Sequence, residues 1–139
     1  MDLPCFSANL RRASRAVGRL YGSEIRKGGL EPTQFTLLAV LARLDEAMQR
    51  ELAERLAIDS TTLTRTLDRL EEQGWVTSRR GDDRRERWIR LTPRGRRRFE
   101  AAVPHWQAAQ ERLRKALGEE NWSPLLERLV QVTRAAEVA

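Results

Sequence analysis

The sequence predicts a mostly α-helical protein with one short β-ribbon. Over most of the chain, apolar residues recur at intervals of three and four, which is the spacing of one helix face. Only two segments, residues 75–79 and 87–91, have the strand-prone composition that would form a pair of short strands. A length of 139 residues is enough for a single domain with its own core.

The first two expected helices differ in how much of their surface is apolar. Between residues 7 and 27 the apolar side chains share one stripe and the arginines lie opposite, so we expect a surface helix that stops at Gly28. The second helix opens at Glu31 with Pro32 in its first position. Its apolar residues extend nearly all round as far as Leu44, which predicts a buried core helix.

A short helix, a tight turn and a capped helix follow one another between residues 48 and 74. Leu52 and Leu56 give the short helix one inward face, and the turn covers residues 57–59. The next helix begins at Asp59 or Ser60, whose side chain can accept from free backbone N–H groups, and ends before Gly74. This order is typical of a helix-turn-helix unit.

The capped helix has two faces with different chemistry. Leu63, Leu67 and Leu70 lie on the core-facing stripe. The outward side of the first two turns carries hydroxyls and arginine, with no acid before Asp68. Such a surface can enter the major groove of DNA, although an ordinary solvated face would explain the same residues. The outward and flanking residues are Thr61, Thr62, Thr64, Arg65 and Arg69.

The two strand segments are joined by a polar loop, residues 80–86, and together predict a hairpin. Ile89 and Leu91 alternate with Arg90, as in a half-buried strand. A two-stranded ribbon is marginal alone, so we expect it to rest on the helices. A helix-turn-helix followed by a basic ribbon is the winged form of that unit, whose loop can reach phosphates or an A·T-rich minor groove.

Two more helices are expected after the ribbon. The first has Thr92 as its cap, begins at Pro93 and runs to about residue 117, with a kink or interruption at Pro104. The last covers about residues 122–136, with Pro124 near its start. One small domain cannot cover the apolar stripes of all the terminal helices. We therefore expect residues 1–31 and 92–139 to form a homodimer interface around a DNA-binding part at residues 32–91.

The net charge of +6 is concentrated in one place. Residues 79–98 contain ten arginines and three acids, a local excess of +7, which indicates a specific surface for a polyanion. One histidine, one cysteine and no glycine-rich phosphate loop or metal-spaced cluster argue against an enzyme, a metal site or a cofactor. No apolar run of about 18 residues and no signal peptide are visible, so we expect no membrane partner and a cytoplasmic protein.

Five short segments carry a resemblance to a known family. They are Pro-Thr-Gln-Phe-Thr-Leu-Leu at 32–38, Glu-Leu-Ala at 51–53, the helix and turn at 63–76, Asp-Arg-Arg at 83–85 and Leu-Thr-Pro-Arg-Gly at 91–95. In this order they resemble the MarR family of winged helix-turn-helix transcription regulators, over essentially the whole chain. The resemblance implies a mostly α fold and a single domain, residues 1–139, whose terminal helices form a homodimer.

The resemblance also implies which residues contact DNA. The recognition-helix positions are Ser60, Thr61, Thr62, Thr64 and Arg65. Arg85 is expected to reach the minor groove, with Asp83 steadying it. By position and charge, Arg79, Arg84 and Arg87 are expected phosphate contacts.

The function that follows is sequence-specific regulation of transcription. We expect a repressor that binds a palindromic operator as a homodimer and is released by a small ligand or an oxidant. The alternative is a non-specific architectural DNA-binding protein, which would share the basic surface but would not need the capped helix with threonines and arginine outward.

Two kinds of signal remain open. Cys5 and Phe6 resemble the branch of the family that senses organic hydroperoxides, with Tyr21 in one of the tyrosine places, and a cysteine at a helix start gains thiolate character. The alternative role for Cys5 is a small apolar residue at a dimer interface.

The other signal is an aromatic or phenolic effector bound among the first, second and fifth helices. The candidate lining residues are Arg15, Arg19, His105 and Trp106. For His105 and Trp106, ordinary packing beside Pro104 is the alternative.

Overall fold

The computed structural model describes residues 4–139 and confirms a mostly helical chain with a small antiparallel sheet. Its elements, in chain order, are α1 (Phe6–Lys27), α2 (Pro32–Arg43), β1 (Ala47–Met48), α3 (Gln49–Leu56), α4 (Ser60–Glu72), β2 (Val76–Arg80), β3 (Arg87–Leu91), α5 (Pro93–Leu117) and α6 (Glu119–Val138). No helix within these residues is long and apolar enough to cross a membrane.

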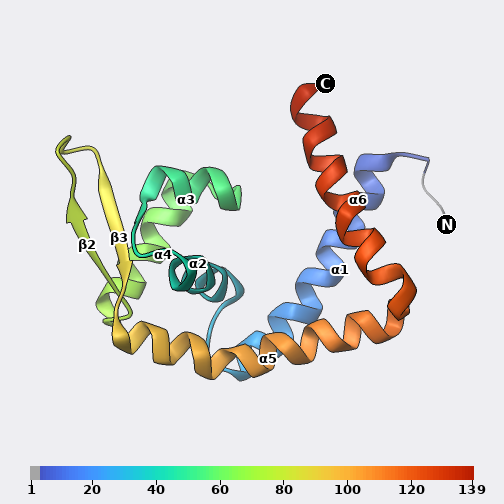
Figure 1. Ribbon diagram of the computed structural model, residues 1–139, viewed down its shortest axis with the longest axis horizontal. Helices are drawn as coiled ribbons and strands as arrows, with labels where there is room; N and C mark the ends of the chain where they lie inside the picture. Colours follow the sequence, from blue (N-terminus) through green and yellow to red (C-terminus); the bar gives the residue numbers. More distant parts are fainter. Residues whose placement is uncertain (1–3) are drawn as a thin grey trace.

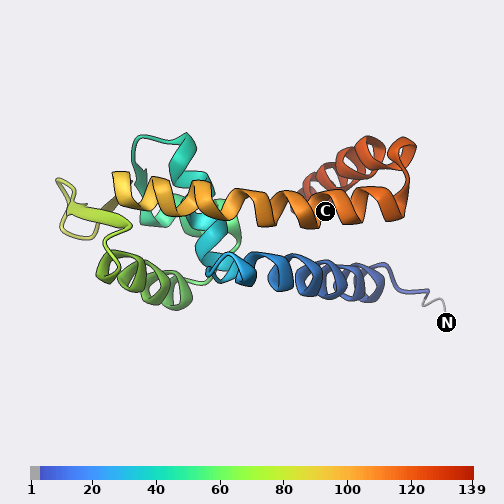
Figure 2. The same ribbon diagram turned by 90° about the horizontal axis from the view of Figure 1, so that it is seen from below.

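The molecule has a lobe at one end and a helical arm at the other (Figure 1). The lobe contains α2, α3, α4 and the β-hairpin. The long helix α5 leads out of this lobe, and α6 folds back from its far end. The last turns of α1 pack against α5, while its beginning leads away from α5 (Figure 1 and Figure 2). The arrangement separates a compact lobe from an extended pair of terminal segments.

The core of the lobe is built from leucines on α2 and α4. Leu37, Leu38 and Leu41 of α2 are fully buried, which confirms α2 as a core helix. The three leucines expected on the inner stripe of α4 are also fully buried. Burying a leucine side chain contributes about 1.5–3 kcal/mol, so these contacts fix the inner face of α4 and leave its polar face outward.

The sheet has three strands, where the sequence predicted two. The strand order is β1-β3-β2, with Ala47 opposite Ile89 and Val76 opposite Leu91. β1 was not predicted because its two residues are too few to show an alternating pattern. The extra strand explains how the hairpin is held, since β3 is paired on both sides and Ile89 is buried at the centre.

Helices α5 and α6 differ from the prediction in two respects. α5 runs from Pro93 to Leu117 as one helix, so Pro104 does not interrupt it. α6 begins at Glu119, three residues earlier than expected, and Pro124 lies inside it. The turn between the helices needs only Gly118, whose φ of 88° belongs to the left-handed region that glycine adopts freely.

The approach of α5 to the hairpin also depends on a glycine. Gly95 is buried in the first turn of α5, and a Cβ atom there would collide with the backbone carbonyl of Trp75. The Thr92 side chain caps this helix by accepting from the Gly95 N–H at 3.0 Å, while its hydroxyl donates to the Gly74 carbonyl at 2.7 Å. The end of α4 is thereby tied to the start of α5.

A buried carboxylate joins α1 to α5. Glu24 is only 6% exposed and accepts from Lys27 Nζ at 3.0 Å and from Arg112 Nη1 at 2.7 Å. The hydrogen bond from Lys27, and then the one from Arg112, hold the pKa of Glu24 below its usual value. This contact fixes α1 on α5 at the point where α1 enters the lobe.

The terminal helices leave apolar surface uncovered. α6 has no buried residue, and its Leu126 and Val130 are 48% and 50% exposed. Leu10 and Val17 on α1 are also exposed. α6 buries little apolar surface within one chain, so its apolar stripe is available to pack against another surface.

Candidate nucleic-acid interface

The start of α4 is fixed by Asp59. Its carboxylate accepts from the Thr62 backbone N–H at 2.9 Å and from the Thr62 hydroxyl at 2.6 Å. The hydroxyl contact is the larger cause, and both lower the pKa of Asp59. This confirms Asp59 as the cap and shows that the Thr62 hydroxyl is already engaged.

The outer face of α4 presents Ser60, Thr61, Thr64, Arg65 and Asp68 along one shallow depression. All five are exposed. The Thr64 hydroxyl accepts from Gln49 Nε2 of α3 at 2.7 Å, which orients it toward the short helix. Thr61 and Arg65 have no such partner within residues 4–139 and are the outward groups best placed to meet a ligand.

The loop between β2 and β3, with these strands, is called the wing here. Its turn is held by Asp83, whose side chain accepts from the Arg85 backbone N–H at 3.0 Å and whose carbonyl accepts from the Glu86 N–H at 2.9 Å. Arg80 Nη1 donates to the Arg84 carbonyl at 2.9 Å. Arg84 and Arg85 are exposed at the tip, in a loop that these contacts keep in one shape.

The wing is bonded to α4 through Glu71. Glu71 Oε1 accepts from the Ser78 hydroxyl at 2.8 Å, and its Oε2 accepts from Arg87 Nη2 at 2.9 Å. Arg87 Nη2 also lies 3.0 Å from Oδ1 of Asp68, and the Arg87 side chain is only 16% exposed. The hydrogen bond from Ser78, and then the one from Arg87, lower the pKa of Glu71.

Arg79 lies on the opposite face of the wing. Its guanidinium donates to both carboxylate oxygens of Glu46, at 2.7 and 2.8 Å, and lies over the Trp88 ring with 5.3 Å to the centroid. The hydrogen bonds of this ion pair raise the pKa of Arg79 and lower that of Glu46. Arg79 and Arg87 therefore both have carboxylate partners, and a phosphate contact from either would require an exchange of ion pairs.

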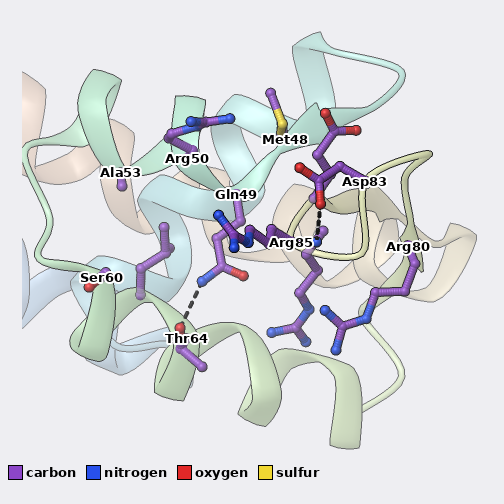
Figure 3. A pocket seen from close by; sticks show the side chains of 12 residues that line it. Met48, Gln49, Arg50, Ala53, Ser60, Thr64, Arg80, Asp83 and Arg85 are labelled. Atoms are coloured by element: carbon purple, nitrogen blue, oxygen red, sulfur yellow. Dashed lines mark hydrogen bonds between the residues drawn. The ribbon is translucent and has the colours of Figure 1, made fainter.

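A hollow of about 590 Å³ opens between α3, α4 and the wing, and we call it the wing groove. Figure 3 shows Gln49 and Arg50 reaching it from α3, Thr64 from α4, and Arg80 and Arg85 from the wing. The remaining lining residues are Met48, Ala53, Ser60, Leu63, Asp83, Glu86 and Arg87. Four arginines and two acids make it an electropositive depression.

Gln49, Arg50 and Arg80 also belong to this surface, although no sequence pattern singled them out. The pairing of Ser78 with Ile89 and of Arg80 with Arg87 puts these side chains on the side of the wing that faces α4. Because side chains alternate along a strand, Arg79 then points away. The sequence already indicated that Ile89 points toward the core. Had the same alternation been applied to β2, it would have placed Arg80, and not Arg79, on the face of the wing that faces α4.

A second hollow of about 590 Å³ lies among α1, α2 and α5, where an effector pocket was expected. Trp106 and Tyr21 line it, but Arg15, Arg19 and His105 do not. Arg15 and Arg19 border a separate shallow depression on α1, and the His105 ring lies against Gly28. The full lining is Tyr21, Ile25, Pro32, Phe35, Thr36, Ala39, Val40, Ala42, Arg43, Arg96, Phe99, Val103 and Trp106.

Cys5 is exposed at the cap position of α1. Tyr21 lies on the same helix, roughly 24 Å further along its axis at 1.5 Å per residue, so the two side chains of one chain cannot meet. The Tyr21 hydroxyl instead donates to Gln110 of α5, and partial burial raises its pKa. A Tyr21 contact to Cys5 would have to come from a second copy of the chain.

Within residues 4–139 there is no group of three or more metal-binding side chains. The face of α4 with the wing groove beside it offers hydrogen-bond donors and positive charge on a convex helix and a neighbouring loop. This combination suits the edges and phosphates of a nucleic acid duplex.

Comparison with known proteins identifies the family. A family model described as MarR matches residues 30–86. A solved structure of the M. tuberculosis transcriptional regulator MosR in complex with DNA is 34% identical, with a TM-score of 0.82, and the match covers 96% of this chain and 97% of MosR. This chain belongs to the MarR family.

Other relatives fit the same assignment. A MarR variant from E. coli complexed with operator DNA is 25% identical, with a TM-score of 0.80 and 91% coverage of both chains. The uncharacterized HTH-type transcriptional regulator YwoH of Bacillus subtilis is 31% identical over 66% of this chain and 66% of its own length. The chain thus spans just under two thirds of this curated relative. In the structure, the winged helix-turn-helix fold predicted from the sequence is confirmed.

Proposed function

We propose that this protein is a transcriptional repressor that binds a near-palindromic operator as a homodimer in the cytoplasm. The observation that carries the proposal is the exposed face of α4, with Thr61 and Arg65 outward, beside a wing whose tip presents Arg84 and Arg85. A helix of this kind enters the major groove while a wing reaches the adjacent minor groove. The MosR structure with DNA and the E. coli MarR structure with operator DNA support this use of the fold.

The remaining residues of the proposed DNA surface are assigned from their positions. Ser60, Thr62 and Thr64 lie on α4 beside Thr61, and Arg69 is exposed one turn beyond Arg65. The wing contributes Arg84 and Arg85, with Asp83 holding the Arg85 backbone. Arg79 and Arg87 belong to this set only if their carboxylate partners release them.

The homodimer rests on the uncovered apolar surface of the terminal helices. Leu125, Leu126 and Leu129 of α6 are 40–48% exposed, and Phe6, Leu10 and Val17 of α1 are exposed as well. A twofold dimer would cover these stripes and present two α4 helices to successive major grooves on one face of the duplex, about 34 Å apart. Sedimentation of the wild type and of Leu126→Glu tests this, because a buried charge should shift the variant to monomer.

Release from DNA would follow the binding of a small aromatic effector to the pocket among α1, α2 and α5. Its walls carry Phe35, Phe99 and Trp106, with the Phe35 ring 5.4 Å from Phe99 and 6.3 Å from Trp106. Arg43 and Arg96 at the same pocket could meet an anionic group. Thermal denaturation with a panel of phenolic acids checks this; no stabilisation by any of them would contradict it.

The experiment that tests the function is a comparison of two affinities. The protein is titrated against duplexes from its own upstream DNA, located by footprinting, and against the same bases scrambled, at one stated salt concentration. A sequence-specific regulator should prefer the footprinted site by about 10³-fold or more. A ratio near one would instead indicate a non-specific architectural DNA-binding protein.

A further inference from the structure

We propose that the wing groove holds one sugar–phosphate strand of the operator, and that Arg50 of α3 binds its phosphates opposite Arg80 of the wing. The inference rests on the proposed DNA binding and extends it to residues outside the face of α4 and the tip of the wing. Figure 3 shows both arginines bordering the hollow, from different elements.

The shape of B-form DNA requires a strand at this place. If α4 lies in a major groove and the wing reaches the neighbouring minor groove, then the backbone strand dividing those grooves must pass between the helix and the wing. The wing groove is the space between them, at about 590 Å³ and open to solvent. If DNA contacted only the outer face of α4, no hollow between α4 and the wing would be needed.

The charges in the groove favour a phosphate over a neutral ligand. Arg50 is exposed and has no carboxylate within 4.0 Å among residues 4–139, and Arg80 donates only to a backbone carbonyl of the loop. Arg87 is different, because Asp68 and Glu71 already neutralise it. The arginines left to bind an anion are therefore Arg50, Arg80 and Arg85.

The two acids of the groove accept hydrogen bonds within the wing. Asp83 accepts from the backbone N–H of Arg85, and Glu86 accepts from the indole N–H of Trp88 at 3.4 Å. They lower the positive potential, but three arginines without carboxylate partners still leave an excess of one positive charge. An electropositive groove of this kind attracts a sugar–phosphate strand whatever its sequence.

The width of the groove is set by contacts that do not involve DNA. The bonds of Glu71 to Ser78 and Arg87 hold the wing against α4, and the bond from Gln49 to Thr64 holds α3 against α4. Arg50 lies next to Gln49 in the first turn of α3, so this helix holds its backbone at the edge of the groove. The phosphate contact is consequently offered by a preformed site.

The test compares Arg50→Ala with Arg55→Ala, which removes the same charge from another exposed position of α3 that does not line the groove. We expect Arg50→Ala to weaken binding about tenfold for operator and scrambled DNA alike. It should also reduce the slope of log K against log salt by about 0.9 for each subunit. Arg55→Ala should change affinity less than twofold, and circular dichroism should show both variants folded.

A second arm uses DNA in which single phosphates are replaced by uncharged methylphosphonates. At one position in each half-site, the methylphosphonate should weaken DNA binding by the wild type about as much as Arg50→Ala does. The same methylphosphonate should not weaken binding by Arg50→Ala any further. Equal losses for Arg50→Ala and Arg55→Ala would overturn the proposal. So would a loss confined to the operator with an unchanged salt slope, because that result would mean that Arg50 recognises bases.

These outcomes are separate from the failure of the proposed function. A wild type that binds operator and scrambled DNA equally would refute specific regulation, yet the salt slopes of the two variants would still test the groove.

Discussion

Arg87 on the wing donates to Glu71 near the end of α4 at 2.9 Å, and this ion pair ties the wing to α4. Neither residue lies at the loop tip or on the outermost face of α4. The guanidinium also meets Asp68, so one side chain of β3 holds two acids of α4. The wing is in this way positioned before any DNA arrives.

We expect Arg87→Lys to lower operator affinity about fivefold without changing the salt slope. Both acids meet Nη2 of Arg87. Lysine keeps the charge but carries it on a flexible stem without the rigid guanidinium, so it should hold Glu71 and Asp68 less firmly, and a partly exposed pair of this kind is worth about 1 kcal/mol at most. Arg90→Lys, on the opposite face of β3, is the matched control and should bind as the wild type does. A reduced salt slope in Arg87→Lys would instead identify Arg87 as a direct phosphate contact.

Acid should weaken the same connection. The pKa of Glu71 is lower in the folded protein, chiefly through the Ser78 hydroxyl and then through Arg87. The stabilisation is therefore complete above the unfolded-state pKa and is lost as pH falls through the folded-state pKa. We expect the free energy of unfolding in urea to be lower for Ser78→Ala than for wild type at pH 7, by less than about 1 kcal/mol, and the difference to shrink as pH falls through the folded-state pKa of Glu71.

The matched control for this pH series is Ser14→Ala, an exposed serine on α1. It should follow the wild type at every pH. A difference between wild type and Ser78→Ala that grew on acidification would contradict the assignment of this titration to Glu71.

Removal of the α4 cap should destabilise the fold. Asp59→Ala leaves the Thr62 N–H without its 2.9 Å partner and removes a negative charge from a helix start, which costs about 1 kcal/mol. Asp59→Asn can still accept the hydrogen bond and should recover most of the loss. Urea denaturation of the three proteins measures the effect, and equal stability of Asp59→Ala and wild type would be inconsistent with the cap.

Oxidant sensing is tested at Cys5. The thiol is exposed at the start of α1, so a hydroperoxide can reach it. If Cys5 is the sensor, cumene hydroperoxide should release the wild type from DNA and leave Cys5→Ser bound. Release of both proteins would show that the oxidant acts elsewhere, and release of neither would leave a small ligand as the signal.

The local patterns of the chain were sufficient for most of the fold. The stripe of Leu63, Leu67 and Leu70 and the cap at Asp59 predicted α4, and both features are present in the structure. β1 was not predicted because it has only two residues and is defined by its pairing with β3, which lies about forty residues further along the chain. The start of α6 was placed late because Gly118 alone makes the turn, without the loop that the sequence suggested.

The candidate site was less accessible to sequence reasoning for the same physical reason. A helical or alternating pattern says which way a side chain points, as it did for Arg65, but not which acid it will meet. From the sequence, Arg79 and Arg87 were expected to be free to contact phosphates. In the fold, tertiary contacts pair Arg79 with Glu46 and Arg87 with Glu71. Arg50 and Arg80 were not predicted as site residues, because the wing groove forms only when α3, α4 and the wing come together in the fold.

The central claim is that α4 and the wing divide the work of recognition. The measurement is the affinity of the wild type, Arg65→Ala and Arg85→Ala for the operator, for single-base variants of it and for scrambled DNA, all at one salt concentration. We expect Arg65→Ala to lose about 1–3 kcal/mol of discrimination at one base position, and Arg85→Ala to weaken binding to every duplex by a similar factor. The same loss of specificity from both substitutions, or no loss from either, would contradict the account.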